Sequence, residues 1–312
     1  MYDLLVLWDL DGTLLNAGGV GGELYNVVFL QLFGRSLNAF APMAGRTDRA
    51  IILETLEMAG VPEPRRYVDP FIAGLTAHAP EVREAVAIRG RALPGAAAAL
   101  TALASARTLA TLGQSGRVHQ SVLTGNIRPV AEVKLAALGL RDPLDLCIGA
   151  YGDDHEVRTE LVQVARRRAG AVHGTSPSDF DGLSTVLIGD TPLDIEAALT
   201  SGARAVGVAT GPYPAADLQA AGAHAVLPDL TDTTLVMQAL LPLSSATSRA
   251  RQAGEHGLSS PVQPRACSDS ATCAAVAHPS RVTSSHPYRS VDPPSAVAPL
   301  SRLLSAPRRS SG

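Results

Sequence analysis

Lysine is nearly absent from this sequence of 312 residues: Lys134 is the only one among 26 basic residues. Cysteine is also scarce, because three scattered residues are too few for a disulfide framework or a four-cysteine zinc site. No apolar run approaches the roughly 18 residues that suggest a membrane span. The formal net charge of −3 is too small to indicate nucleic-acid or membrane binding. These absences favour a cytoplasmic protein that binds neither membranes nor nucleic acids.

The first apolar run, Leu4 to Trp8, ends abruptly in the string Asp9-Leu10-Asp11-Gly12-Thr13. A short continuous apolar run predicts a strand of a parallel sheet that is buried on both faces, so we expect Trp8 to be buried. Further strands are predicted at 121–124, 144–150, 185–189, 203–209 and 223–227. Segments with helical spacing alternate with these strands, and this alternation predicts an α/β fold with a doubly wound parallel sheet.

Residues 17–91 have a different pattern from the segments on either side of them. Apolar residues such as Leu24 and Val28 recur there at helical spacing, and glycines and prolines separate the helical stretches. We therefore expect an all-helical cap domain, residues 17–91, inserted into a core domain that comprises residues 1–16 and 92–243.

The segment 244–312 is rich in serine and proline and contains one aromatic residue, Tyr288. A segment of this composition buries too little apolar surface to offset the entropy lost on ordering. We therefore predict that residues 244–312 form a disordered tail.

Asp9 and Asp11 directly follow the first predicted strand, and ligands bind beyond the carboxyl ends of strands in an open parallel sheet. One carboxylate of such a pair can attack phosphorus, while the other gives and later takes a proton. Gly12 lets the backbone turn close to a phosphate. An isolated Asp-x-Asp is usually only a polar turn, but the five-residue string after an apolar strand favours the chemical interpretation.

Four segments, in this order, resemble the motifs of the haloacid dehalogenase superfamily. Asp9 to Thr13 is similar to motif one, Thr124 to motif two, Lys134 to motif three, and Gly189 to Asp194 to motif four. The resemblance covers about residues 1–240. It implies a Rossmann-like core, and four motifs in the same order make it specific.

The resemblance implies a role for each matching residue. Asp9 would be the nucleophile, Asp11 the general acid and base, and Thr124 and Lys134 would hold the phosphate. Lys134 would bridge the nucleophile and the phosphate. A surface lysine usually serves only solubility, but this one stands where a compact ammonium fits and a guanidinium fork does not.

The resemblance also implies Mg²⁺, bound by Asp9, the backbone carbonyl of Asp11, and Asp190, with Asp194 as a further ligand or a partner of one. Carboxylates that meet a phosphate dianion need a counter-charge, since two unit charges 4 Å apart interact by about 4 kcal/mol at an effective dielectric near 20. A hard dication supplies this charge. Alternatively, Asp190 and Asp194 are only the cap and first-turn acid of the following helix.

Residues beside these motifs are the candidates for binding substrate. They are Gly12, Thr13, Gly125, Asn126 and Arg46. Arg46 lies in the helical insert at the expected start of a helix, where Thr47 or Asp48 can act simply as its cap.

The insert lies between motifs one and two, and this resembles the all-helical cap subclass of the superfamily. Such a cap implies a small phosphorylated metabolite, such as phosphoglycolate or a sugar phosphate, and we expect a monomer or homodimer. We predict a Mg²⁺-dependent phosphatase that forms an aspartyl phosphate. A dehalogenase does not need Asp11, and a phosphonoacetaldehyde hydrolase needs a second lysine. A β-phosphoglucomutase-like phosphomutase and a non-catalytic binding module stay open as alternatives.

Overall fold

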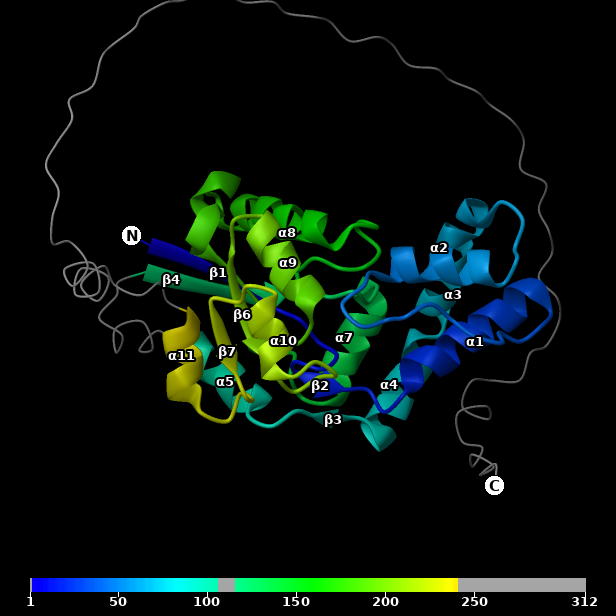
Figure 1. The fold of residues 1–312 in the computed structure, drawn as a ribbon, viewed down its shortest axis with the longest axis horizontal. Coiled ribbons are helices and arrows are strands. Elements are labelled where there is room, and N and C mark those ends of the chain that lie inside the picture. Colours follow the sequence, from blue (N-terminus) through cyan, green and yellow to red (C-terminus); the bar gives the residue numbers. More distant parts are fainter. Residues whose placement is uncertain (1, 106–115, 241–312) are drawn as a thin grey trace, which may run out of the picture. The chain divides into compact units, whose positions relative to one another are not determined.

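The computed structural model describes residues 2–105 and 116–240, so the predicted tail lies outside the described residues. Five strands form a sheet in the order β4-β1-β5-β6-β7 (Figure 1). Their bounds are β1 Tyr2–Trp8, β4 Gly116–Val122, β5 Thr185–Gly189, β6 Arg204–Val208 and β7 Ala225–Leu227. Each neighbouring pair is parallel, which confirms the predicted fold class.

Strand β1 lies between β4 and β5, and its side chains are buried on both faces of the sheet. Side chains alternate along a strand, so Leu4, Val6 and Trp8 belong to one hydrophobic cluster, and Leu5 and Leu7 belong to another. Helices α5 (Ala96–Ala104) and α11 (Thr233–Leu240) contribute to the first cluster, and α8 (Arg158–His173), α9 (Pro192–Thr200) and α10 (Ala215–Ala220) to the second. The sheet is therefore covered on both faces, and Trp8 is fully buried as expected.

The elements described between residues 20 and 89 are all helical, as the sequence predicts. They are α1 Val20–Phe33, α2 Asp48–Met58, η1 Pro64–Tyr67, α3 Val68–Ala77 and α4 Ala79–Arg89. A short antiparallel pair of strands, β2 (Leu15–Asn16) and β3 (Arg91–Ala92), joins the two ends of this insert, and the sequence pattern does not predict it. Within the described ranges, no helix has the length and apolar character needed to cross a membrane.

The prediction of a strand at 144–150 is wrong. The Asp145 carboxylate accepts a hydrogen bond from the Cys147 backbone N–H at 3.0 Å, and the Ile148 N–H donates to the Asp145 carbonyl at 3.3 Å. These local bonds turn the chain. Its backbone donates to β4 at two separate points, from the Asp145 N–H to the Gln120 carbonyl at 2.9 Å and from the Ala150 N–H to the Val122 carbonyl at 2.9 Å, and forms no continuous strand between them. Helix α7 spans Arg128–Ala137.

Candidate active site

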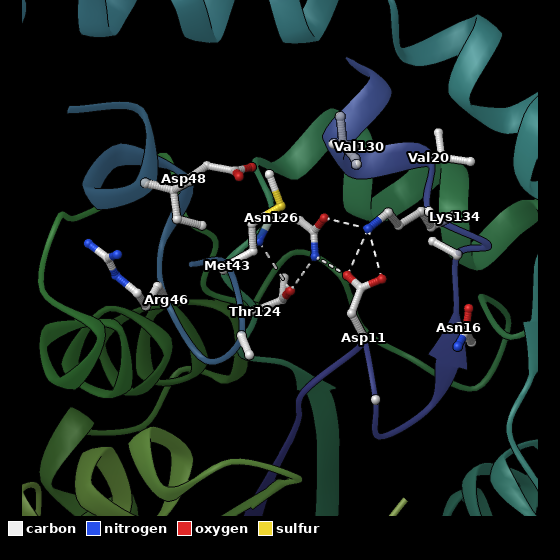
Figure 2. Close-up of a pocket in the computed structure, with 18 of the residues that line it drawn as sticks. Asp11, Asn16, Val20, Met43, Arg46, Asp48, Thr124, Asn126, Val130 and Lys134 are labelled. Carbon is white, nitrogen blue, oxygen red and sulfur yellow. Dashed lines mark hydrogen bonds and ion pairs between the residues drawn. The ribbon is translucent and has the colours of Figure 1, made fainter. Parts of the chain in front are cut away.

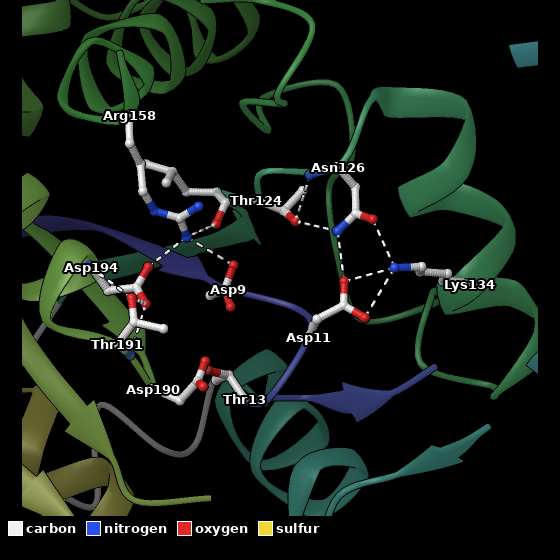
Figure 3. A network of polar contacts seen from close by, with 11 residues as sticks. Asp9, Asp11, Thr13, Thr124, Asn126, Lys134, Arg158, Asp190, Thr191 and Asp194 are labelled. Atoms are coloured by element: carbon white, nitrogen blue, oxygen red, sulfur yellow. Dashed lines mark hydrogen bonds and ion pairs between the residues drawn. The ribbon is translucent and has the colours of Figure 1, made fainter. Parts of the chain in front are cut away.

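Three acidic side chains meet beyond the carboxyl ends of β1 and β5. These strands are neighbours, so Asp9, which follows β1, lies close to Asp190, which follows β5. Asp194 joins them from the first turn of α9. All three side chains are buried, and each offers a carboxylate oxygen within 4.8 Å of those of the other two (Figure 3).

Asp194 is a first-turn acid of helix α9, as one interpretation of the sequence proposes, but the cap is not Asp190. Thr191 is the N-cap residue, and its hydroxyl accepts a hydrogen bond from the Asp194 N–H at 3.3 Å. In return, Asp194 Oδ2 accepts from the Thr191 N–H at 3.0 Å and from its hydroxyl at 2.7 Å. This capping box holds the Asp194 carboxylate in a fixed orientation beside the other two acids.

Arg158 is the cation in contact with Asp9, and no sequence motif described above predicted it. Its Nη2 donates to Asp9 Oδ1 at 2.8 Å and to Asp194 Oδ1 at 2.5 Å. Although burial lowers the pKa of Arg158, the charges of Asp194 and Asp9 raise it well above the usual range. Arg158 is the first residue of helix α8, and a positive charge at the N-terminus of a helix is unfavourable because it opposes the helix dipole. This unfavourable position is the local feature of the sequence that could have indicated a functional role for Arg158.

Burial makes the carboxylates of Asp9 and Asp190 costly to ionise. It raises the pKa of Asp9 well above the usual value, and the neighbouring Asp194 raises it further. Burial and Asp194 likewise raise the pKa of Asp190 to about 7, although the Thr13 hydroxyl, which donates to Asp190 Oδ1 at 3.1 Å, lowers it. These clustered carboxylates therefore need positive charge beyond that of Arg158 if all of them are to ionise.

The free oxygens of these acids fit a small, hard cation. No hydrogen bond from the described residues reaches Oδ2 of Asp9 or of Asp190, whereas both oxygens of Asp194 accept hydrogen bonds. Glycine backbone closes around Asp190 Oδ2, since a Cβ added at Gly12 or Gly211 would lie 2.3 or 1.7 Å from it. Carboxylate oxygens in so confined a space match the chemistry of Mg²⁺, and Asp194 fits as a partner of the ligands.

Lys134 does not make the expected bridge to Asp9. Its Nζ lies 2.9 and 2.7 Å from the two carboxylate oxygens of Asp11 and 2.7 Å from Asn126 Oδ1 (Figure 3). The structure thus pairs Lys134 with Asp11, and Arg158 with Asp9. The physical reason is placement, because Lys134 comes from helix α7, on the side of the site where Asp11 lies.

Thr124 and Asn126 form a short polar loop after β4. The buried Thr124 hydroxyl accepts hydrogen bonds from the Asn126 N–H at 3.2 Å and from its Nδ2 at 2.8 Å. The Thr124 hydroxyl hydrogen therefore stays available for an acceptor such as a phosphoryl oxygen. Between these two residues, the Gly125 carbonyl accepts from the Asp48 N–H of helix α2 at 2.7 Å, which brings the insert against this loop.

The two residues before α2 have different roles, since Thr47 caps the helix and Arg46 forms an ion pair. Thr47 is the N-cap of α2, as one interpretation of the sequence proposes, and its hydroxyl accepts from the Ala50 N–H at 3.3 Å. The Arg46 guanidinium pairs with Glu54 at 2.5 Å. Figure 2 shows the Arg46 side chain directed away from Asp11, and its guanidinium contacts Glu54 and the Pro42 carbonyl instead of the site carboxylates.

A cavity of about 890 Å³ joins these groups. The predicted site residues that line it are Asp9, Asp11, Gly12, Arg46, Thr124, Gly125, Asn126, Lys134 and Asp190; Thr13 and Asp194 lie behind this surface. The insert and α7 add an apolar wall that includes Val20, Met43 and Val130 (Figure 2). A cavity of this size suits a small-molecule ligand.

Comparison with known proteins agrees with this architecture. The family model of haloacid dehalogenase-like hydrolases matches residues 6–199. A predicted phosphatase from Clostridium acetobutylicum has a similar structure, with 17% sequence identity and a TM-score of 0.51, covering 76% of this chain and 100% of its own. A hydrolase from Pseudomonas syringae has 22% identity and a TM-score of 0.48, covering 77% of this chain and 100% of its own. At 17% identity the first of these structures shows the fold alone, and no curated protein sequence matches. The family match over residues 6–199 shows that the chain belongs to the haloacid dehalogenase-like hydrolases.

Proposed function

We propose that this protein is a Mg²⁺-dependent phosphatase that hydrolyses a small phosphate monoester through an aspartyl phosphate on Asp9. One observation carries the proposal. Asp9 and Asp190 are buried close together in the lining of one cavity, each with an oxygen that no described residue engages, and Arg158 holds the other oxygen of Asp9. This arrangement suits a fixed nucleophile that faces a charged ligand.

The chain's own residues divide the reaction into two steps. An oxygen of Asp9 attacks phosphorus, the bond from phosphorus to the leaving oxygen breaks, and protonated Asp11 gives its proton to that oxygen. Asp11 then takes a proton from water as the water oxygen attacks phosphorus and releases Asp9. Throughout both steps, Arg158 keeps the Asp9 carboxylate in place, and the Thr124 hydroxyl donates to a phosphoryl oxygen.

The free oxygens of Asp9 and Asp190, together with the backbone carbonyl of Asp11, would hold Mg²⁺. The ion supplies the positive charge that lets a phosphate dianion approach these carboxylates. The two oxygens of Asp194 already accept hydrogen bonds from Arg158 and Thr191, so Asp194 would support the metal site without contacting the ion itself.

The helical insert, residues 17–91, would act as the cap domain over the core of residues 1–16 and 92–243. Support comes from the cavity, which is lined by residues of both parts, and from the contact between Asp48 and Gly125. A cap in this position excludes water and limits the substrate to a small phosphorylated metabolite.

The test is release of inorganic phosphate from a panel of small phosphate esters with Mg²⁺. The panel includes p-nitrophenyl phosphate, phosphoglycolate and hexose phosphates. We expect steady release from at least one ester. If hexose phosphates are isomerised with negligible phosphate release, the phosphomutase alternative holds instead, and absence of both reactions contradicts an enzymatic role in phosphoryl transfer.

A further inference from the structure

We infer that Lys134 is a positioning residue for Asp11 and does not hold the phosphate. The inference rests on the proposed function, since it concerns the residue that gives and takes the proton. Lys134 and Asn126 would together fix the Asp11 carboxyl group so that it faces the leaving oxygen of the substrate.

The hydrogen bonds of Lys134 carry this inference. An ammonium group has three hydrogens to donate. The three acceptors within reach of Nζ are Asp11 Oδ1 at 2.9 Å, Asp11 Oδ2 at 2.7 Å and Asn126 Oδ1 at 2.7 Å. Every donor of Lys134 therefore has a partner inside the protein, and none is left over for a phosphate oxygen.

Asn126 completes the arrangement, because its amide is also fully engaged. Its Oδ1 accepts from Lys134, so its Nδ2 must face the opposite way, where it donates to Asp11 Oδ2 at 2.7 Å and to the Thr124 hydroxyl at 2.8 Å. Asp11 Oδ2 therefore receives two hydrogen bonds and Oδ1 receives one. Although the Asp11 side chain is 41% exposed, it is held from both oxygens (Figure 2).

The two cations of the site serve different carboxylates. Arg158 contacts Asp9 and Asp194, while Lys134 contacts Asp11. The removal of each cation should therefore disturb a different part of the reaction. Loss of Arg158 affects the nucleophile, on which every substrate depends. Loss of Lys134 affects proton transfer to the leaving oxygen, on which only substrates with poor leaving groups depend. The ratio kcat/KM isolates this step, because it does not include the later attack of water, in which Asp11 serves every substrate.

The ammonium group of lysine also suits this place better than a guanidinium group. Lys134 is 4% exposed, and its three acceptors surround one nitrogen. A guanidinium group is larger and planar and presents its donors as a fork, so it cannot direct three hydrogen bonds from a single point. This requirement gives a physical reason for the one lysine in a chain whose other basic residues are all arginine.

The experiment compares two substrates of similar size: p-nitrophenyl phosphate, whose leaving group needs no proton, and benzyl phosphate, whose leaving group does. Lys134→Met should lower kcat/KM for benzyl phosphate by about 10–100-fold, which is part of the 10²–10⁴-fold that general acid–base catalysis contributes. It should change kcat/KM for p-nitrophenyl phosphate by less than about 3-fold, because this ratio includes the transfer to Asp9 but not the later attack of water on the aspartyl phosphate. Lys134→Arg should show the same selectivity.

Two comparisons separate positioning from a structural effect. The double variant Lys134→Met with Asp11→Asn should be no slower on benzyl phosphate than Asp11→Asn alone, because both changes remove the same function. As the matched control, Arg158→Lys should lower kcat/KM for both substrates by a similar factor. If Lys134→Met does not fold, Asn126→Ala provides a second test, with a smaller loss that is again selective for benzyl phosphate.

Three outcomes would overturn the inference. An equal loss of kcat/KM on both substrates would show that Lys134 holds the phosphate. Unchanged kcat/KM for benzyl phosphate in Lys134→Met and Asn126→Ala would show that neither residue positions Asp11. If the wild-type protein hydrolyses no phosphate ester, the proposed function fails and the role of Lys134 fails with it, a result that is distinct from the first two.

Discussion

The contact between the helical insert and the loop after β4 depends on a buried carboxylate, Asp48. Its Oδ1 accepts a hydrogen bond from the Tyr25 hydroxyl of α1 at 2.6 Å, and its Oδ2 accepts from the Ile127 N–H at 2.8 Å. We predict that Tyr25→Phe, which removes one hydroxyl and keeps the ring, destabilises the protein. The loss should be larger at pH 8 than at pH 5.

The sign of this pH dependence follows from the pKa of Asp48. Burial raises that pKa from 3.8 to about 6, while the bonds from Tyr25 and Ile127 lower it. Because the folded-state pKa is the higher one, the contribution of Asp48 to stability is greatest below about pH 4 and declines as the pH rises toward 6. Tyr25→Phe removes a donor that favours the carboxylate, so it raises this pKa further and costs most where Asp48 is ionised.

The size of the effect follows from the charge state of the acceptor. A hydrogen bond to a charged group is worth about 1.5–3 kcal/mol, and one between neutral groups about 0.5–1.5 kcal/mol. We therefore expect losses of about 2 kcal/mol at pH 8 and about 1 kcal/mol at pH 5. In a protein of this size these correspond to decreases in melting temperature of about 4–8 °C and 2–4 °C.

The assay is thermal unfolding of the wild-type protein and Tyr25→Phe at both pH values, so that titrations common to the two proteins cancel. Tyr67→Phe is the matched control: its hydroxyl has no hydrogen bond among the described residues, and its ring packs against Phe33. It should change the melting temperature little at either pH. An equal decrease for Tyr25→Phe at pH 5 and pH 8 would refute the argument from the ionisation of Asp48.

Three further predictions concern the acidic cluster. Asp9→Asn keeps the shape but removes the nucleophilic charge, so phosphate release should fall to background, and substantial turnover would contradict the assignment. Excess EDTA should abolish hydrolysis of an aryl phosphate and Mg²⁺ should restore it, whereas full activity in EDTA would exclude the metal. Asp190→Asn should weaken Mg²⁺ binding at least about 10-fold, as measured by calorimetry. Loss of a residue that hydrogen-bonds to a metal ligand typically costs about 10–100-fold in affinity, and loss of the ligand itself should cost no less. Unchanged affinity would show that the ion binds elsewhere.

Much of the fold and part of the site could be predicted from local sequence. Apolar runs that end in acids placed Asp9 and Asp190 at strand ends, because a strand buried on both faces must be apolar and its polar residues begin where it ends. The helical insert was equally visible from its spacing of apolar residues. The same rule failed at 144–150, where an apolar run is turned by the Asp145 side chain before it can pair along its length with β4.

Only the tertiary structure decided which cation faces which carboxylate. Arg158 reaches Asp9 across 149 positions of sequence, and Lys134 reaches Asp11 across 123. Local spacing reports which face of a helix or strand is buried, but it carries no information on which side chains meet over such separations. Arg158 is also one arginine among many, whereas Lys134 is the single lysine of the chain. The composition therefore favoured Lys134 as the cation beside Asp9, whereas the structure pairs Lys134 with Asp11 and Arg158 with Asp9. The sequence determined that a cation must accompany these buried acids, and the packing of α7 and α8 against the strand ends determined which cation each acid received.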